Sequence, residues 1–272
     1  MEELKKFVLD LSVAGVERLH ERYVLLRLTQ AEQLPPMMPG QFVEVRVDRA
    51  PGTFLRRPIS INYVDRQRNE LWLLVAMVGE GTRQLACLKE GDVLNVVGPL
   101  GHGFTGQSGA TALREVLLVG GGVGVAPLLY QGACLKSVGV RPVFLLGART
   151  AKDLLMLDEF RKYGEVYVTT EDGSEGEKGF VTQHTILQKQ RFDLIQTCGP
   201  TPMMRAVARY AYQQGIDCEV SLENMMACGL GACLCCVEKV RHREEDGTVA
   251  LRNVCVCKDG PVFDKEELTW QI

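Results

Sequence analysis

The pattern of hydrophobic residues changes near residue 114, and this change limits the folds open to the chain. Before it, short apolar or alternating runs follow one another between turn signals, with no helical pattern among them. After it, apolar runs alternate with segments of helical period. Successive short strands are typical of a barrel or sandwich, whereas alternating strands and helices are typical of an open, mostly parallel sheet. The sequence therefore predicts a β unit followed by an α/β unit.

Six strand-like runs make up the expected β unit, an antiparallel β-barrel that we place at residues 1–113. Turn signals such as PPMMPG, RQRN and KEGD separate the runs. In QFVEVRV, residues 41–47, apolar and polar residues alternate, which predicts a half-buried strand. The other five runs are residues 5–13, 22–30, 58–65, 70–78 and 92–100.

The expected α/β unit spans residues 114–222. Its first apolar run, EVLLV, predicts a buried parallel strand. The uncharged segment 116–135 is long enough to span a bilayer. Its central glycines and Pro127 instead favour a strand, a turn and a helix that ends at Gly139. Further strands are expected at 141–148, 165–170, 192–199 and 217–222, and further helices at 153–164, 184–190 and 200–215.

A glycine-rich turn, GGGVGVAP, joins that first strand to the first helix. Glycines there allow a backbone to approach a pyrophosphate, and helix amides can receive its charge. The strict GxGxxG spacing is not met, and the next strand ends at Arg149 rather than at an acid, so NAD and NADP both stay open. A plain strand-to-helix turn is the alternative. The candidate nucleotide-binding residues are Gly120, Gly121, Gly122 and Gly124.

The sequence CGP closes a later strand of the same unit. In an open α/β sheet the carboxyl ends of the strands line the ligand crevice. Cys198 is therefore a candidate catalytic residue facing a bound cofactor, with Gly199 and Pro200 as binding residues beside it. The alternative is a small residue buried for packing.

Two motifs in the β unit carry possible ligand-binding groups. RRPISI places Arg57 three residues before Ser60 on one strand, which offers a cation for a diphosphate and a hydroxyl for a ring atom. VGEGT, residues 78–82, adds a glycine turn that is a possible phosphate cradle. Taken alone, RRPISI is better explained as an ordinary strand with a surface arginine, and a plain hairpin turn is the alternative for VGEGT.

Six of the ten cysteines lie in the last fifty residues, 223–272. Cys228, Cys233 and Cys236 have the spacing C-x4-C-x2-C, and a further thiol follows as Cys255 or Cys257. This is the plant-type [2Fe–2S] spacing. A zinc site built from two cysteine pairs would need a C-x-C pair and would leave Cys228 unused. Packing alone explains one or two buried thiols but not this spacing.

The order of these motifs resembles the ferredoxin–NADP reductase superfamily across nearly the whole chain. In that superfamily a β-barrel with an Arg-x-x-Ser strand binds flavin and an α/β domain binds a nicotinamide dinucleotide. The tail, MACGLGACLCCVEKV followed by CKDGPVF, is similar to the electron-transfer subunit of class B dihydroorotate dehydrogenase.

The resemblance implies a set of site residues. The cluster ligands would be Cys228, Cys233, Cys236 and Cys257, with Cys257 preferred to Cys255 because it precedes the DGPVF block. Cys235 and Cys255 would then be extra thiols. Residues 223–272 would form the [2Fe–2S] subdomain. The flavin-binding residues would be Arg57, Pro58, Ile59, Ser60, Leu74, Val75, Ala76, Gly81 and Thr82.

The resemblance also implies cofactors, a partner and a pathway. The chain would hold FAD and one [2Fe–2S] cluster and would use NAD as substrate. It would receive electrons from the FMN of a dihydroorotate dehydrogenase catalytic subunit, in a heterotetramer that serves pyrimidine biosynthesis. A reductase subunit for sulfite reductase, hydrogenase or ferredoxin is the enzymatic alternative. A zinc-stabilised binding module is the non-enzymatic one.

Charge and composition exclude other classes of protein. The net charge of −3, from 31 basic and 34 acidic residues, predicts no nucleic-acid-binding face. The start, MEELKKFVLDLSV, does not read as a signal peptide. Clustered thiols without such a peptide favour a reducing cytoplasm and metal ligation over disulfides.

Overall fold

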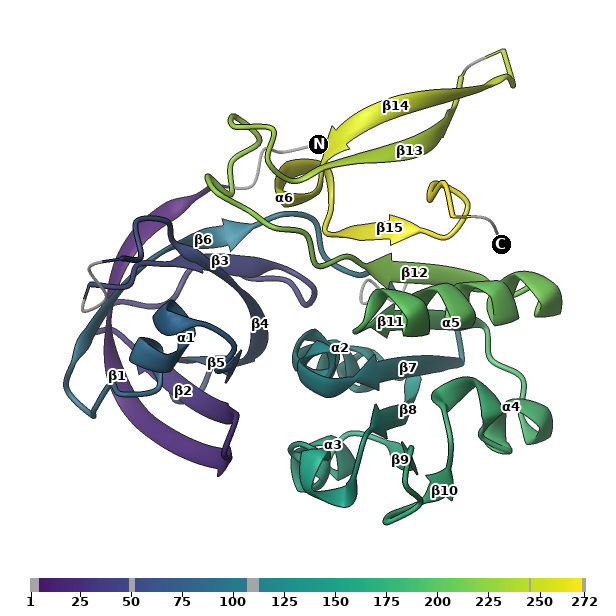
Figure 1. Ribbon diagram of the computed structural model, residues 1–272, viewed down its shortest axis with the longest axis horizontal. Helices are drawn as coiled ribbons and strands as arrows, with labels where there is room; N and C mark the ends of the chain where they lie inside the picture. The colour runs from purple at the N-terminus through teal and green to yellow at the C-terminus, as the bar shows by residue number, and fades with distance from the viewer. Residues whose placement is uncertain (1–4, 49–51, 107–112, 245, 271–272) are drawn as a thin grey trace.

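The computed structural model describes residues 5–48, 52–106, 113–244 and 246–270. Figure 1 shows a β-barrel beside an α/β sheet, with the C-terminal region lying above both. The barrel and the mostly parallel sheet confirm the two fold classes that the sequence predicts.

Six antiparallel strands close the barrel in the order β1-β2-β5-β4-β3-β6. Its interior is filled by aliphatic side chains from every strand, such as Leu11, Leu26 and Val96. Because inward and outward residues alternate along each strand, the outer face needs its own cover wherever it is apolar. The strands are Phe7–His20, Tyr23–Thr29, Phe42–Val45, Arg57–Asp65, Glu70–Ala76 and Val93–Leu100, for β1 to β6 in chain order.

One local prediction in the barrel is wrong. The alternation of residues 41–47 predicted a half-buried strand, but all four residues of β3 are buried. The outer face of β3 is covered by the C-terminal region, which no local pattern could indicate. The alternative offered for VGEGT, a plain hairpin turn, is excluded, since the segment leads into the short helix α1, Glu80–Leu85.

A seven-stranded sheet forms the second layer, in the order β10-β9-β8-β7-β11-β12-β15. All neighbours are parallel except β15, which comes from the C-terminal region and runs antiparallel to β12. The tail is therefore joined to the sheet by strand pairing. The strands are Glu115–Gly121, Arg141–Ala148, Glu165–Thr170, Glu177–Lys178, Leu194–Cys198, Asp217–Ser221 and Val262–Asp264, for β7 to β12 and β15.

Helices bury both faces of the sheet, which explains why β7 is continuously apolar. Leu117 and Val119 face the core formed with α5, while Val116 and Leu118 face the core formed with α2. The helices are α2 (Ala126–Ser137), α3 (Leu157–Arg161), α4 (Ile186–Lys189) and α5 (Thr201–Gln214), with 3-10 turns η1 (Gly122–Val125), η2 (Ala151–Asp153) and η3 (Val181–Gln183).

The segment 116–135 folds as β7, η1 and most of α2, as its glycines predicted. Among the helices in the described part of the chain, none is long and apolar enough to cross a membrane. The prediction of a single helix over residues 153–164 is wrong. The chain is extended at Leu154 and left-handed at Met156, so Leu155 is buried from a loop and only α3 is helical.

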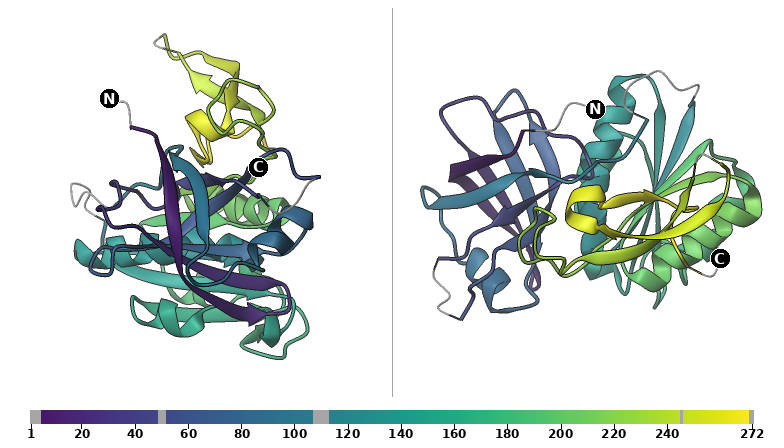
Figure 2. Two further views of the ribbon diagram at one scale, coloured as in Figure 1. Left: turned by 90° about the vertical axis from the view of Figure 1, so that its left-hand side faces the viewer. Right: turned by 90° about the horizontal axis from the view of Figure 1, so that it is seen from above.

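The C-terminal region projects beyond both layers (Figure 2). Its antiparallel hairpin consists of β13, Val237–Arg243, and β14, Val249–Cys255. The polar RHREEDGT stretch, residues 241–248, spans the end of β13 and the link to β14, and Glu245 lies outside the described residues. The short helix α6, Val256–Asp259, then returns the chain to β15.

Gly132 in α2 provides a test of how tightly the sheet and this helix pack. Alanine is favoured over glycine in helices by about 1 kcal/mol. However, a Cβ at Gly132 would lie 2.2 Å from Cζ of Phe144, which is fully buried against Phe160. We expect Gly132→Ala to lower the free energy of unfolding by about 1–3 kcal/mol, measured by urea denaturation.

The control is Ser137→Ala, at an exposed position of the same helix. This variant should differ from the unsubstituted protein by less than about 0.5 kcal/mol. Equal unfolding curves for Gly132→Ala and the unsubstituted protein would show that the Phe144 ring moves freely, contrary to this packing.

Candidate functional site

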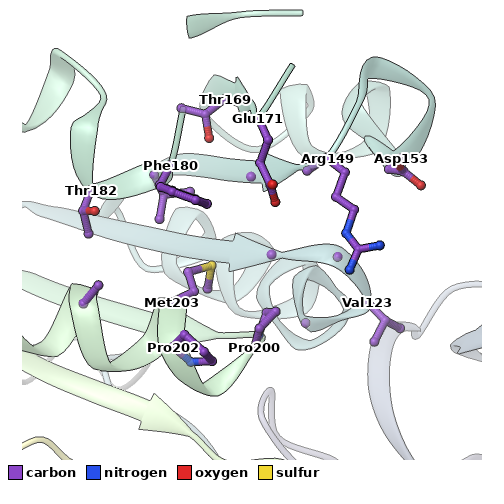
Figure 3. A pocket seen from close by; sticks show the side chains of 18 of the residues that line it. Val123, Arg149, Asp153, Thr169, Glu171, Phe180, Thr182, Pro200, Pro202 and Met203 are labelled. Atoms are coloured by element: carbon purple, nitrogen blue, oxygen red, sulfur yellow. The ribbon is translucent and has the colours of Figure 1, made fainter. Parts of the chain in front are cut away.

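A cavity of about 620 Å³ lies at the carboxyl ends of β7, β8, β9 and β11. Figure 3 shows Arg149 and Glu171 pointing toward it from one wall, with Pro200 and Met203 on the opposite wall. Its volume falls within the ordinary range for cofactor sites, and its position matches the ligand crevice of open α/β sheets. The candidate residues Gly121, Gly122, Gly124, Gly199 and Pro200 all line it.

Each glycine of the turn between β7 and α2 is required, or tolerated, for a different structural reason. A Cβ at Gly124 would lie 2.4 Å from Cα of Gly199, so this glycine lets η1 pack against the loop after β11. Gly122 has φ +56°, and only the Tyr23 hydroxyl, at 4.0 Å, would be near an added Cβ. Gly122 therefore leaves an open, backbone-lined approach that suits a pyrophosphate. Gly120 packs against Val125 and does not line the cavity.

Cys198 lies behind the cavity wall. Its side chain is 1% exposed, and it is absent from the cavity lining, whereas the next residue, Gly199, lines it. Burial raises the pKa of the Cys198 thiol well above its usual range, and the charge of Glu223 adds to this. The thiol is therefore protonated at neutral pH. Glu223 itself lines the cavity, and no motif in the sequence indicated it.

The barrel contributes one edge of the cavity, which sequence reasoning missed. Arg22 and Tyr23, at the β1–β2 turn, line it together with Asp153 of the α/β unit. Arg22 Nη2 lies 2.6 Å from Asp153 Oδ1. Burial works to raise the pKa of Asp153, but the hydrogen bond from Arg22 outweighs it and holds this pKa below its ordinary value. The ion pair thus links the two units at the cavity mouth.

The candidate flavin residues lie where two barrel strands separate. The ladder between β4 and β5 ends at Ile61 and Leu73. Beyond that point residues 57–60 pair only with β3, and residues 74–76 pair only with β2. The two segments therefore offer backbone donors and acceptors to a ligand lying between them. The side chains of Leu74 and Val75 are buried, so only their backbone can contribute to such a site.

Arg57 and the GEGT segment meet at this opening. Arg57 Nε would be 3.0 Å from a Cβ at Gly81, so the glycine leaves room where the guanidinium passes. The Thr82 hydroxyl oxygen accepts hydrogen bonds from the backbone amides of Val78 and Gly79, with N···O distances of 3.0 and 3.1 Å. Thr82 therefore shapes the start of α1, while Arg57 is the cation available to a phosphate.

The four predicted cluster cysteines form two pairs of neighbouring thiols. The Cys233 amide nitrogen lies 3.5 Å from Cys228 Sγ, and the Cys257 amide nitrogen lies 3.4 Å from Cys236 Sγ. Among the described residues, no three His, Cys, Asp or Glu side chains converge as a single metal ion requires. A two-iron cluster instead needs two cysteines for each iron. The donor set therefore fits a two-iron cluster better than one zinc ion.

Backbone amides point at these sulfurs. Leu230 N lies 3.3 Å from Cys228 Sγ, and Gly231 N lies 3.1 Å from Cys257 Sγ. Burial works to raise the pKa of Cys228, but its amide hydrogen bonds outweigh this and lower it to about 6. Left-handed backbone at Gly229, Gly231 and Leu234 turns the loop around the thiols. Such a cradle suits the sulfurs of an iron–sulfur cluster.

The two extra thiols, Cys235 and Cys255, have surroundings unlike those of the four candidate ligands. Cys255 Sγ lies 3.7 Å from the carbonyl oxygen of Gly231, so it faces an acceptor rather than an amide. Burial raises its pKa. Cys235 is exposed on the loop surface.

The cysteine loop lies directly on the barrel. A Cβ at Gly229 would be 2.6 Å from Cγ of Glu44 and 3.1 Å from Leu100. Glu44 pairs with Pro58 of the flavin strand β4. The candidate cluster and flavin sites are thus separated by one barrel strand.

These features define a flavin- and nicotinamide-dependent reductase with an added iron–sulfur region. Three family models match in that order: an oxidoreductase FAD-binding domain at residues 18–104, an oxidoreductase NAD-binding domain at 118–209, and the iron–sulfur cluster binding domain of dihydroorotate dehydrogenase B at 223–269.

The chain belongs to the family of electron transfer subunits of dihydroorotate dehydrogenase B (NAD(+)). It is 41% identical to the subunit from Fusobacterium nucleatum over 231 residues, which cover 83% of this chain and 84% of that protein. It is 44% identical to the Bacillus cereus subunit over 227 residues, with the same coverage. These similarities confirm the family that the cysteine tail indicated.

A solved structure of NADH-dependent reduced ferredoxin–NADP oxidoreductase is also similar. It matches with a TM-score of 0.80 and 32% identity, over 96% of this chain and 90% of that one. The reductase GcoB from Amycolatopsis, at 24% identity and a TM-score of 0.66, shares the fold.

Glu171 provides a test of coenzyme choice. Its carboxylate would repel the additional phosphate of NADPH, whereas Arg149 on the same wall would attract it. We expect Glu171→Gln to reduce the preference for NADH over NADPH by about tenfold in kcat/KM, measured with ferricyanide as acceptor. Arg149→Gln should increase that preference.

The control is Glu175→Gln, an exposed carboxylate on the same loop that does not line the cavity. It should leave the preference unchanged. An unaltered preference in Glu171→Gln would exclude this carboxylate from coenzyme selection.

Proposed function

We propose that this chain passes electrons between an FMN-containing dihydroorotate dehydrogenase catalytic subunit and NAD⁺, through a [2Fe–2S] cluster and FAD. The observation that carries the proposal is the grouping of four cysteines in two pairs, three on a loop that packs against the strand next to the candidate flavin strand and the fourth on α6. When bound, the cluster carries single electrons, and the flavin exchanges these with it and a hydride with NAD.

The proposed binding residues follow from the geometry. Cys228 with Cys233 would hold one iron, and Cys236 with Cys257 the other. The backbone of residues 57–60 and 74–76 would hold the flavin ring, with Arg57 at its diphosphate. The open backbone at Gly122 would receive the NAD pyrophosphate. Cys198, as a protonated thiol behind Gly199, would shape the wall beside the nicotinamide rather than attack it.

The assembly and its setting are part of the same proposal. Residues 1–113, 114–222 and 223–272 would act as flavin, nicotinamide and cluster units. Relatives named as electron transfer subunits imply a catalytic partner, and we propose a heterotetramer in the cytoplasm that serves pyrimidine biosynthesis.

The test is the complex co-expressed with its catalytic subunit and purified without oxygen. We expect about two irons and two sulfides per FAD, and orotate formation coupled to NAD⁺ reduction. Zinc without iron in a colourless protein would refute the cluster, and a complete cofactor set without dihydroorotate oxidation would refute the partner.

A second candidate is a reductase subunit for a ferredoxin-linked complex. It is favoured by the similarity to NADH-dependent reduced ferredoxin–NADP oxidoreductase over 96% of this chain. Rapid reduction of the cofactors by reduced ferredoxin, with no response to dihydroorotate in the presence of the catalytic subunit, would support this function instead.

The fourth cluster ligand can be tested by substitution. Cys257→Ser removes a thiol whose sulfur accepts a hydrogen bond from the Gly231 amide and lies next to Cys236. We therefore expect this variant to lose the cluster absorbance. Cys255→Ser is the matched control two residues earlier, and it should retain that absorbance and the iron content. The reverse pattern would assign Cys255 as the ligand.

A further inference from the structure

Glu44, in the middle of β3, is a buried carboxyl group that the proposed relay does not use. Its side chain is fully buried, and neither carboxylate oxygen has a hydrogen-bond partner among the described residues. A buried carboxyl without partners is costly, so its presence calls for a physical reason.

The carboxyl lies between the barrel and the cysteine loop. The neighbouring residues Val43 and Val45 point into the barrel core, so Glu44 points outward. There it meets the backbone of Gly229, since a Cβ on that glycine would be 2.6 Å from Glu44 Cγ and 3.0 Å from Glu44 Oε1. Gly229 directly follows Cys228, so the carboxyl lies beside the first turn of the loop.

The charges around Glu44 come from two sides. Arg56 and Arg57 lie on the barrel side and Cys228 lies on the loop side. The Arg56 guanidinium is already bonded to the carbonyl oxygens of Glu44 and Asn95 and to the Asn95 side chain. It therefore attracts the Glu44 carboxylate without bonding to it. Burial raises the pKa of Glu44 to about 7, and the arginines oppose this rise.

A purely structural role does not account for this residue. The carboxyl oxygens form no hydrogen bond that would hold the loop in place. An apolar or amide side chain of the same length would fill the space and avoid the cost of burying a charge. What only a carboxylate supplies here is a negative charge in a buried interface.

We propose that Glu44 lowers the reduction potential of the cluster carried by the loop of residues 228–236. A negative charge in a poorly screened interface disfavours the addition of an electron nearby. Glu44 thus acts on the cluster through the electric field of its carboxylate and is not itself a ligand. The inference rests on the proposed cluster assignment.

The test is an anaerobic redox titration of the holo complex, followed by the EPR signal of the reduced cluster. It is run at about pH 8.5, where a carboxyl with a raised pKa is more fully ionised than at neutral pH. At a fixed ambient potential we expect Glu44→Gln to favour the reduced cluster by about tenfold, which is about 59 mV for a one-electron couple. Glu44→Met, also neutral, should shift the equilibrium in the same direction.

Two variants control for charge and for shape. Glu44→Asp keeps the charge and should retain most of the low potential. Glu17→Gln removes the same charge from an exposed position of β1, where water screens it, and should leave the potential unchanged.

The outcomes separate this inference from the proposed function. An intact EPR signal with an unchanged potential in either neutral variant would overturn the role of Glu44. Loss of the cluster in both neutral variants would also overturn it, because the carboxyl would then hold the loop together. An absent signal in the unsubstituted complex would instead refute the cluster itself.

Discussion

The arrangement of the three units depends on the packing of the cysteine loop against the outer face of β3. Gly229 approaches Glu44 and Leu100 so closely that no side chain fits there. Phe42 and Leu100 from the barrel share one hydrophobic core with Trp270 near the chain end. Because β3 is hydrogen-bonded to β4, which carries the candidate flavin residues, this contact sets the separation of the two candidate electron-carrying sites.

Most of the fold could be predicted because its signals are local. Strand alternation, apolar runs and glycine turns depend on neighbouring residues, so the barrel and the sheet appear in the sequence. The cysteine spacing is local too, and the loop and α6 bring those thiols together. The helix expected over residues 153–164 failed because Leu155 is buried by tertiary packing, which outweighs helical propensity.

Two parts of the site that sequence reasoning missed come from contacts between units. Arg22 lies on a barrel hairpin, and only its pairing with Asp153 brings it to the nucleotide cavity. Glu44 belongs to an alternating run whose polar face should meet water, and only the C-terminal region covers it. Glu171 was the exception that could have been found, since it follows β9 at the ligand edge of the sheet.

The same contacts explain why the tail is tied to the rest of the chain at several points. A cluster on a free appendage would have no fixed distance to a flavin. Here β15 pairs with β12 in the sheet, and Gly229 contacts β3. The backbone amide of His102 also donates a hydrogen bond to the carbonyl oxygen of Gly260. These three attachments join the cysteine loop to both other units. These contacts fix the loop between Cys228 and Cys236 relative to the barrel and the sheet, and ligands fixed in this way cost less free energy to order around a cluster.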